Sequence, residues 1–115
     1  MTYEDISRRM EEVMVVGAEI PKTYGGSRPI TRIFDNRIYM RTGVKTQHEK
    51  YVTWDMILFA YEHLPTGFDS EMLANQFPQE FSQGTCVFSM TGGLLVALGL
   101  ARCIRRGNRY RYVSV

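Results

Sequence analysis

Basic residues are missing from a long central part of this 115-residue chain, because residues 51–101 contain no lysine or arginine. Cysteine is also scarce: Cys86 and Cys103 are the only two, and they lack CxxC spacing. This scarcity argues against a disulfide framework or a zinc site and favours reduced core thiols in a cytoplasmic protein. The acidic, amphipathic N-terminus does not resemble a signal peptide. The apolar residues 85–101 include three glycines and are too few to span a bilayer, so no membrane partner is expected.

The charge that is present is divided into blocks. Residues 1–27 carry three basic and five acidic residues, and residues 28–50 carry six basic and two acidic ones. Residues 51–101 add five acids, whereas residues 102–115 carry five arginines and no acid. Such a patched distribution can steer a polyanion even though the net charge is only +2. The alternative is that the acidic and basic segments pair with each other in the folded protein.

The first half of the chain predicts a helix followed by a β-hairpin. Thr2 is expected to cap a helix that ends near Gly17. Its apolar positions recur at helical spacing: Ile6, Met10, Val13 and Met14. Residues 17–29 are rich in proline and glycine and are expected to form a loop. Residues 30–34 and 37–41 are rich in β-formers around an Asp-Asn pair, which predicts a hairpin with a two-residue turn.

Two helices are expected next. After a short strand within residues 44–52, Thr53 is expected to cap a helix with a good apolar stripe, which Pro65 stops. Asp69 is expected to cap a shorter helix that reaches about Phe77. The segment that follows, from Pro78 to Gly84, is expected to be a turn.

The C-terminal part predicts a further helix and a second hairpin. The helix is expected over residues 85–98, with Gly99 as its C-terminal stop. Residues 102–104 and 109–115 are then expected to form strands joined across residues 105–108.

Residues 53–115 resemble a winged helix-turn-helix domain. The matching features are a helix that ends in Leu98-Gly99-Leu100, a basic hairpin, and the aromatic last strand with Tyr110-Arg111-Tyr112. Residues 68–77 match the preceding helix of that motif. The resemblance implies one α+β domain, in which residues 53–115 form the winged-helix core and residues 1–52 add a helix and a β-hairpin.

The resemblance and the C-terminal charge together make DNA binding without catalysis the favoured function, in a role such as transcriptional control. Five arginines of the wing are expected to contact phosphates bidentately or to enter a minor groove: Arg102, Arg105, Arg106, Arg109 and Arg111. The turn and the following helix are expected to add polar contacts through Ser82, Gln83, Thr85 and Ser89. The alternative is an exposed edge hairpin whose arginines only prevent aggregation.

The helix expected over residues 85–98 departs from the recognition-helix pattern. It carries no Arg, Lys, Gln or Asn for reading base edges. Gly92-Gly93 in its middle permits close approach of another backbone, either within the core or from a partner. These departures lead to an alternative function: a protein-interaction module, such as a small phage or mobile-element inhibitor, that docks its partner on this Gly-Gly helix.

Other candidate sites are weaker. A second basic face, suited to single-stranded nucleic acid or simply to solvent, is expected on one strand: Arg37, Tyr39 and Arg41. The sequence Gly25-Gly26-Ser27-Arg28 presents backbone N–H groups to an anion or forms a mobile loop. The first helix is a candidate homodimer face through its apolar residues: Met10, Val13 and Met14.

Residues for catalysis or metal binding are few. Cys86 lies near an expected helix start, yet no local motif surrounds it. His48-Glu49 and Asp55 match no known spacing of metal ligands, and His48 and His63 are typical of surface histidines. The sequence therefore predicts neither enzyme activity nor a metal or cofactor.

Overall fold

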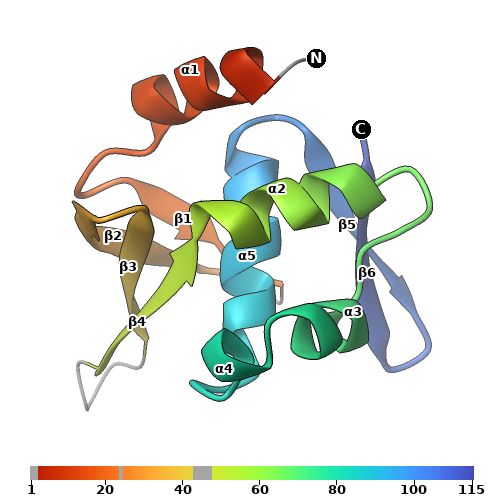
Figure 1. Cartoon of the computed structure of the whole chain (residues 1–115). Coiled ribbons are helices and arrows are strands. Elements are labelled where there is room, and N and C mark those ends of the chain that lie inside the picture. The colour runs from red at the N-terminus through yellow and green to blue at the C-terminus, as the bar shows by residue number, and fades with distance from the viewer. Residues whose placement is uncertain (1–2, 24, 43–47) are drawn as a thin grey trace.

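Two β-structures lie on opposite sides of one buried helix, α5 (Cys86–Ala97), in the computed structural model, which describes residues 3–23, 25–42 and 48–115 (Figure 1). One is an antiparallel sheet in the order β1-β2-β3-β4, with the bounds β1 (Glu19–Pro21), β2 (Ser27–Phe34), β3 (Arg37–Thr42) and β4 (His48–Thr53). The other is the hairpin of β5 (Ala101–Arg106) and β6 (Arg109–Ser114). The remaining helices are α1 (Tyr3–Val13), α2 (Trp54–His63), α3 (Ser70–Gln76) and α4 (Pro78–Phe81). The result is a compact α+β domain.

Helices α2 and α3 begin where the sequence predicts. The Thr53 hydroxyl accepts a hydrogen bond from the backbone N–H of Met56 at 3.2 Å, and the Asp69 carboxylate accepts one from Met72 at 2.9 Å. Each side chain satisfies a backbone donor that the first turn of a helix leaves unpaired. Both N-cap predictions are confirmed. The predicted cap Thr2 lies outside the described residues.

The first predicted hairpin is also confirmed. Asp35 and Asn36 form its turn with φ of 52° and 61°, the left-handed conformation that a type I′ turn requires at both positions. Strand β3 then pairs with β4, which starts at His48 within the predicted residues 44–52; residues 44–47 lie outside the described part of the chain.

Residues 17–29 are not the loop that the sequence predicts, because residues 19–21 and 27–29 pair as β1 and the start of β2. Gly25 and Gly26 adopt φ of 96° and 75°, which lets the chain reverse over a few residues. Pro21 lies in β1 at the edge of the sheet, where a residue without an N–H is tolerated. The predicted turn from Pro78 to Gly84 likewise contains the short helix α4, with Pro78 in its first turn.

The C-terminal hairpin turns more tightly than predicted. Arg106 pairs with Arg109, so only Gly107 and Asn108 form the turn. Gly107 has a φ of 62°, a conformation that favours glycine. Arg105 and Arg106 therefore belong to a strand, and their side chains point to opposite faces of the hairpin.

Helix α5 is buried on all sides. Every residue from Val87 to Leu95 is buried, including the polar Ser89 and Thr91. A Cβ on Gly92 would lie 2.1 Å from the ring of Tyr112 in β6, and one on Gly93 would lie 2.4 Å from the Pro21 carbonyl oxygen in β1. The two glycines thus let the hairpin and the sheet approach α5 within the molecule. The structure therefore shows the close approach within the core that the sequence left open, and the burial of this helix contradicts the alternative of a partner docked on it.

Helix α1 contributes to the same core. Ile6, Met10 and Met14 are buried in it, together with residues of the sheet and of α5. The Arg9 guanidinium also donates to the Leu98 carbonyl at 3.4 Å. Met10 and Met14 are therefore not available for a second copy, which corrects the predicted homodimer face. Of the three residues predicted for it, only Val13 is exposed, at 37%.

Candidate nucleic-acid interface

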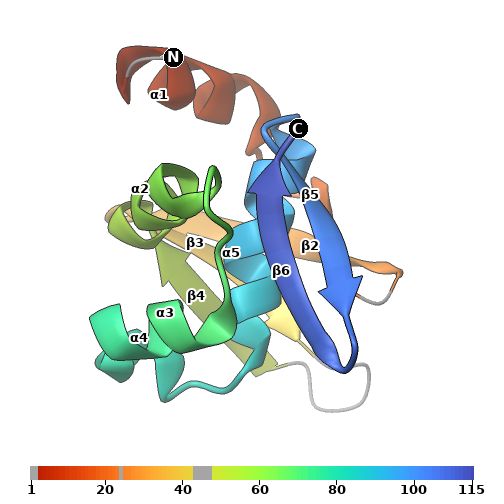
Figure 2. The ribbon, with the colours of Figure 1, turned by 90° about the vertical axis from the view of Figure 1, so that its right-hand side faces the viewer.

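The arginine hairpin, β5 and β6 together, is anchored through Tyr112. This side chain is 1% exposed and packs against Gly92 and, edge to face, against Phe88 of α5. On its other edge β6 bridges to Phe68, with two backbone hydrogen bonds of 2.8 and 2.9 Å between Tyr112 and Phe68. Figure 2 shows the hairpin running alongside α5. The strand that carries Arg109 and Arg111 is therefore fixed to α5 and to Phe68.

The register of the hairpin divides its arginines between two faces. Tyr112 and Cys103 form one pair and face α5, so the alternate pairs point away from the core. Four of the five arginines occupy this outward face: Arg102, Arg106, Arg109 and Arg111. The fifth, Arg105, shares the face of Tyr110; its guanidinium lies 5.7 Å from the Tyr110 ring centre and donates to the Gly107 carbonyl at 2.7 Å.

Most of the outward arginines have no acidic partner among the described residues. Arg102, Arg106 and Arg109 are exposed, and no carboxylate of the described residues lies within 4.0 Å of their guanidinium groups. Arg111 is half-buried over Gly67 and lies 4.0 Å from Asp69, at the limit of an ion pair. The acidic block of residues 51–101 thus leaves three guanidinium groups available to phosphate oxygens.

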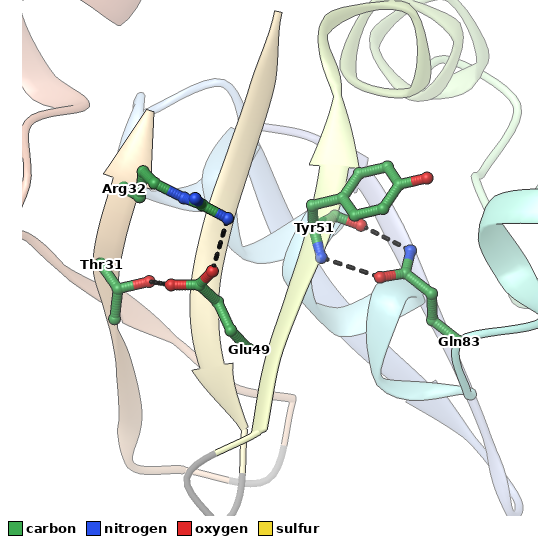
Figure 3. Close-up of polar contacts among 5 residues, drawn as sticks. All are labelled: Thr31, Arg32, Glu49, Tyr51 and Gln83. Atoms are coloured by element: carbon green, nitrogen blue, oxygen red, sulfur yellow. Dashed lines mark hydrogen bonds and ion pairs between the residues drawn. The ribbon is translucent and has the colours of Figure 1, made fainter. Parts of the chain in front are cut away.

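The polar residues predicted before and within α5 differ in their availability. Ser82 and Thr85 are exposed, and the Ser82 hydroxyl donates to the Gln79 carbonyl at 2.5 Å. Ser89 is buried, and its hydroxyl accepts a hydrogen bond from Arg28 at 2.7 Å, so it already has a partner within the fold. The Gln83 amide exchanges two hydrogen bonds, of 2.8 and 3.0 Å, with the backbone of Tyr51 in β4 (Figure 3). The side chains of Gln83 and Ser89 therefore hold the fold together, and their contact with nucleic acid stays a prediction.

The second basic face lies on the outer side of the four-stranded sheet. The register places Arg37, Tyr39 and Arg41 on the face away from the buried Ile38 and Met40. Arg37 and Arg41 are exposed, whereas Tyr39 is half-buried and lies 5.6 Å from Tyr51 between ring centres. This face exists as predicted, and β2 adds Arg32 to it opposite Tyr39.

Two arginines of this face, Arg32 and Arg37, already have partners. Arg32 stacks over Tyr39 with 4.0 Å from its guanidinium carbon to the ring centre, and Arg37 stacks over Tyr51 at 4.3 Å. Figure 3 shows Arg32 and Thr31 converging on Glu49, at 2.9 and 2.6 Å. Cation–π contacts and an exposed ion pair of this kind hold the side chains against the sheet.

The thiols and histidines have separate local surroundings. The Lys50 ammonium donates to the Cys86 sulfur at 3.3 Å, whereas His63 bonds the Phe59 carbonyl at 2.8 Å in α2. Burial raises the pKa of Cys103, which disfavours its nucleophilic thiolate. Within the described ranges, no three His, Cys, Asp or Glu side chains gather closely enough to hold a metal ion.

A half-buried arginine was missed as a candidate by the sequence reasoning. Arg28 pairs with Ile20 in the sheet and faces α5, where it contacts Ser89 across 61 positions of sequence. Only the proposed anion-binding sequence Gly25-Gly26-Ser27-Arg28 pointed to this residue, and it did so for its backbone and not its side chain. Nothing local in the sequence indicates that this guanidinium turns inward.

Comparisons with protein-family models, with curated proteins and with solved structures found no match to this chain. Among the described helices, none is both long enough and apolar enough to cross a membrane.

Proposed function

We propose that this protein binds DNA without catalysing a reaction, and that the outward face of the arginine hairpin contacts the phosphates. The main support for this proposal is that Arg102, Arg106 and Arg109 are exposed on one face, where no described carboxylate lies within 4.0 Å of them. Guanidinium groups without an internal partner are suited to bidentate contacts with phosphate oxygens. Exposed Ser82 and Thr85 remain candidates for additional polar contacts.

The order of the elements supports a winged-helix arrangement as the scaffold. Helix α2 is followed by the bridge at Phe68, then by α3, α4 and α5, and finally by the hairpin. In a winged helix the helix before the wing enters the major groove. Because α5 is buried here, we propose contacts that follow the backbone and do not read bases. Such a contact fits an accessory role in transcriptional control better than operator recognition.

The test measures binding to a labelled duplex of random sequence at several salt concentrations, by fluorescence anisotropy. Two exposed arginines are removed in the variant Arg106→Ala/Arg109→Ala. If both contact phosphates, the slope of log affinity against log salt falls by about 2, and affinity at moderate salt falls by about tenfold or more.

The matched control removes two arginines that already have internal partners, in the variant Arg32→Ala/Arg37→Ala. This control changes the net charge by the same amount, but we expect it to leave the salt slope within error of the wild type. Absence of duplex binding by the wild type would refute the proposal, and so would equal losses in the two double variants.

A further inference from the structure

A basic pocket lies between the hairpin tip, the β1–β2 turn and the start of α3 and α5, with a volume of about 740 Å³. Five cationic side chains line it: Lys22, Arg28, Arg106, Arg109 and Arg111. Two carboxylates, Asp69 and Glu71, lie on the wall formed by α3. Positive charge therefore exceeds negative charge in a concave site, where the surrounding protein screens charges less than bulk water does.

Arg28 is the cation of this pocket that most needs an anion. It is half-buried, and the one hydrogen bond of its side chain that is identified goes to the neutral Ser89 hydroxyl, at 2.7 Å. Among the described residues no carboxylate lies within 4.0 Å of it. Burial lowers the pKa of Arg28, although a guanidinium remains charged at neutral pH. A cation withdrawn from water without a counter-ion is unfavourable, and a bound anion would relieve this cost.

The shape of the pocket distinguishes one kind of phosphate from another. Arg106 and Arg109 are exposed, so a phosphodiester within a duplex can reach them from outside. Arg28 is further inside, and an internal phosphodiester carries chain on both sides that keeps it from entering. A terminal phosphate monoester has a free end and carries up to two negative charges, which suits several guanidinium groups at once.

We infer that this pocket binds a terminal phosphate monoester, with Arg28 as the inner ligand and Arg106 and Arg109 at the rim. The monoester is carried either by the end of a nucleic-acid strand or by a free nucleotide. The inference rests on the proposed function for the first source only. The start of α5, at Thr85 and Cys86 in the pocket wall, adds the favourable end of a helix dipole.

The test compares three forms of one short duplex, carrying 5′-phosphate, 3′-phosphate or only hydroxyl ends, and measures AMP and inorganic phosphate separately by calorimetry. We expect the wild type to bind a phosphorylated end at least about fivefold more tightly than the hydroxyl duplex. Arg28→Gln should abolish this preference and leave binding of the hydroxyl duplex unchanged. The matched control Arg102→Ala removes an arginine outside the pocket and should weaken binding of all three duplexes equally.

The outcomes separate the two proposals. Equal binding of all three duplexes by the wild type, without AMP binding, overturns the pocket inference while the proposed function stands. If no duplex binds but AMP binds the wild type and not Arg28→Gln, the pocket inference holds and the proposed function fails. If Arg28→Gln does not fold, Lys22→Gln replaces it, because Lys22 is an exposed residue of the same pocket and its loss should at least halve the preference.

Discussion

The protein displays arginine on two β-surfaces, and the two differ in what the side chains contact. On the outer face of the four-stranded sheet, Arg32 and Arg37 stack on tyrosines, and Arg32 also pairs with Glu49. On the outward face of the arginine hairpin, Arg106 and Arg109 are exposed without a described carboxylate in reach. The same residue type thus contributes to local structure in one place and is available to a ligand in the other.

The comparison teaches that counting basic residues is a poor guide to a polyanion site. A guanidinium that stacks on a ring and bonds a carboxylate must give up those contacts before it meets a phosphate, which lowers its net contribution to binding. The cross-strand neighbours decide which case applies: tyrosines and Glu49 face the sheet arginines, whereas Arg106 faces Arg109.

The largest expected effect comes from disrupting the contact between Tyr112 of the hairpin and Gly92 of α5. In Gly92→Val the new side chain would collide with the Tyr112 ring, because even a Cβ would lie 2.1 Å from it. We expect a loss of about 3 kcal/mol or more in the free energy of unfolding, measured with chemical denaturant. The duplex affinity of the folded fraction should fall as well, although every arginine is retained.

Gly99→Ala is the matched control for this change. No atom lies within 4 Å of a Cβ at Gly99, but its φ of 77° is unfavourable for alanine. We therefore expect a smaller loss, about 1–2 kcal/mol, with normal duplex affinity. If the two variants lost equal stability, the contact with Tyr112 would not be the reason that Gly92 is required.

Alkaline pH should destabilise the same contact, because it ionises the Tyr112 phenol. Burial raises the pKa of Tyr112 to about 12, from an ordinary value of 10.0. Its contribution to stability is complete below pH 10, where the phenol is neutral in both states, and is lost as the pH rises through about 12. From the size of this shift, we expect a decrease of about 2–3 kcal/mol across this range in the wild type that Tyr112→Phe does not show.

The variant Thr23→Val controls for the hydrogen bond that accompanies this phenol. The Thr23 hydroxyl lies 3.2 Å from the Tyr112 hydroxyl, and its loss should cost about 1 kcal/mol at neutral pH. Because the phenol itself remains, the alkaline decrease should persist in Thr23→Val. Its disappearance there would mean that the contact with Thr23, and not the burial of the phenol, causes the decrease.

A carboxylate placed on the hairpin should give its arginines an acidic partner, as Glu49 does for Arg32 on the sheet. Ile104 lies on the outward face, opposite Arg111 and between Arg102 and Arg106 along β5. In Ile104→Glu these arginines gain a local partner, so we expect duplex affinity to fall by about three- to tenfold. Ile104→Gln keeps the size and polarity without the charge and should change affinity much less. Equal losses would mean that Ile104 acts through packing.

The parts of the fold set by neighbouring residues could be predicted from the sequence. The caps at Thr53 and Asp69 and the turn at Asp35-Asn36 depend on a few adjacent positions, and all three are confirmed. The glycine stop after α5 is of the same kind, since Gly99 has a φ of 77°. Local chemistry of this sort does not depend on the rest of the molecule.

The burial of α5 and the state of each candidate side chain depended on distant residues. A helix that is apolar on all sides is typical of a core element, yet the sequence left open whether Gly92-Gly93 meets the core or a partner. Gln83 meets Tyr51 across 32 positions, and Ser89 meets Arg28 across 61. No spacing rule links such pairs, so the sequence offered both polar side chains as ligands when the fold had already engaged them.

The smallest expected effect comes from releasing a sheet arginine. Glu49→Gln removes the carboxylate that holds Arg32 and Thr31. Because the Arg32 and Glu49 side chains are 55% and 36% exposed, the stability should change by less than about 0.5 kcal/mol. The released guanidinium should raise duplex affinity about twofold at low salt, whereas Glu12→Gln, which removes the same charge from exposed α1, should not. An equal gain in affinity in both variants would mean that duplex affinity follows the net charge of the protein and not the partner of each arginine.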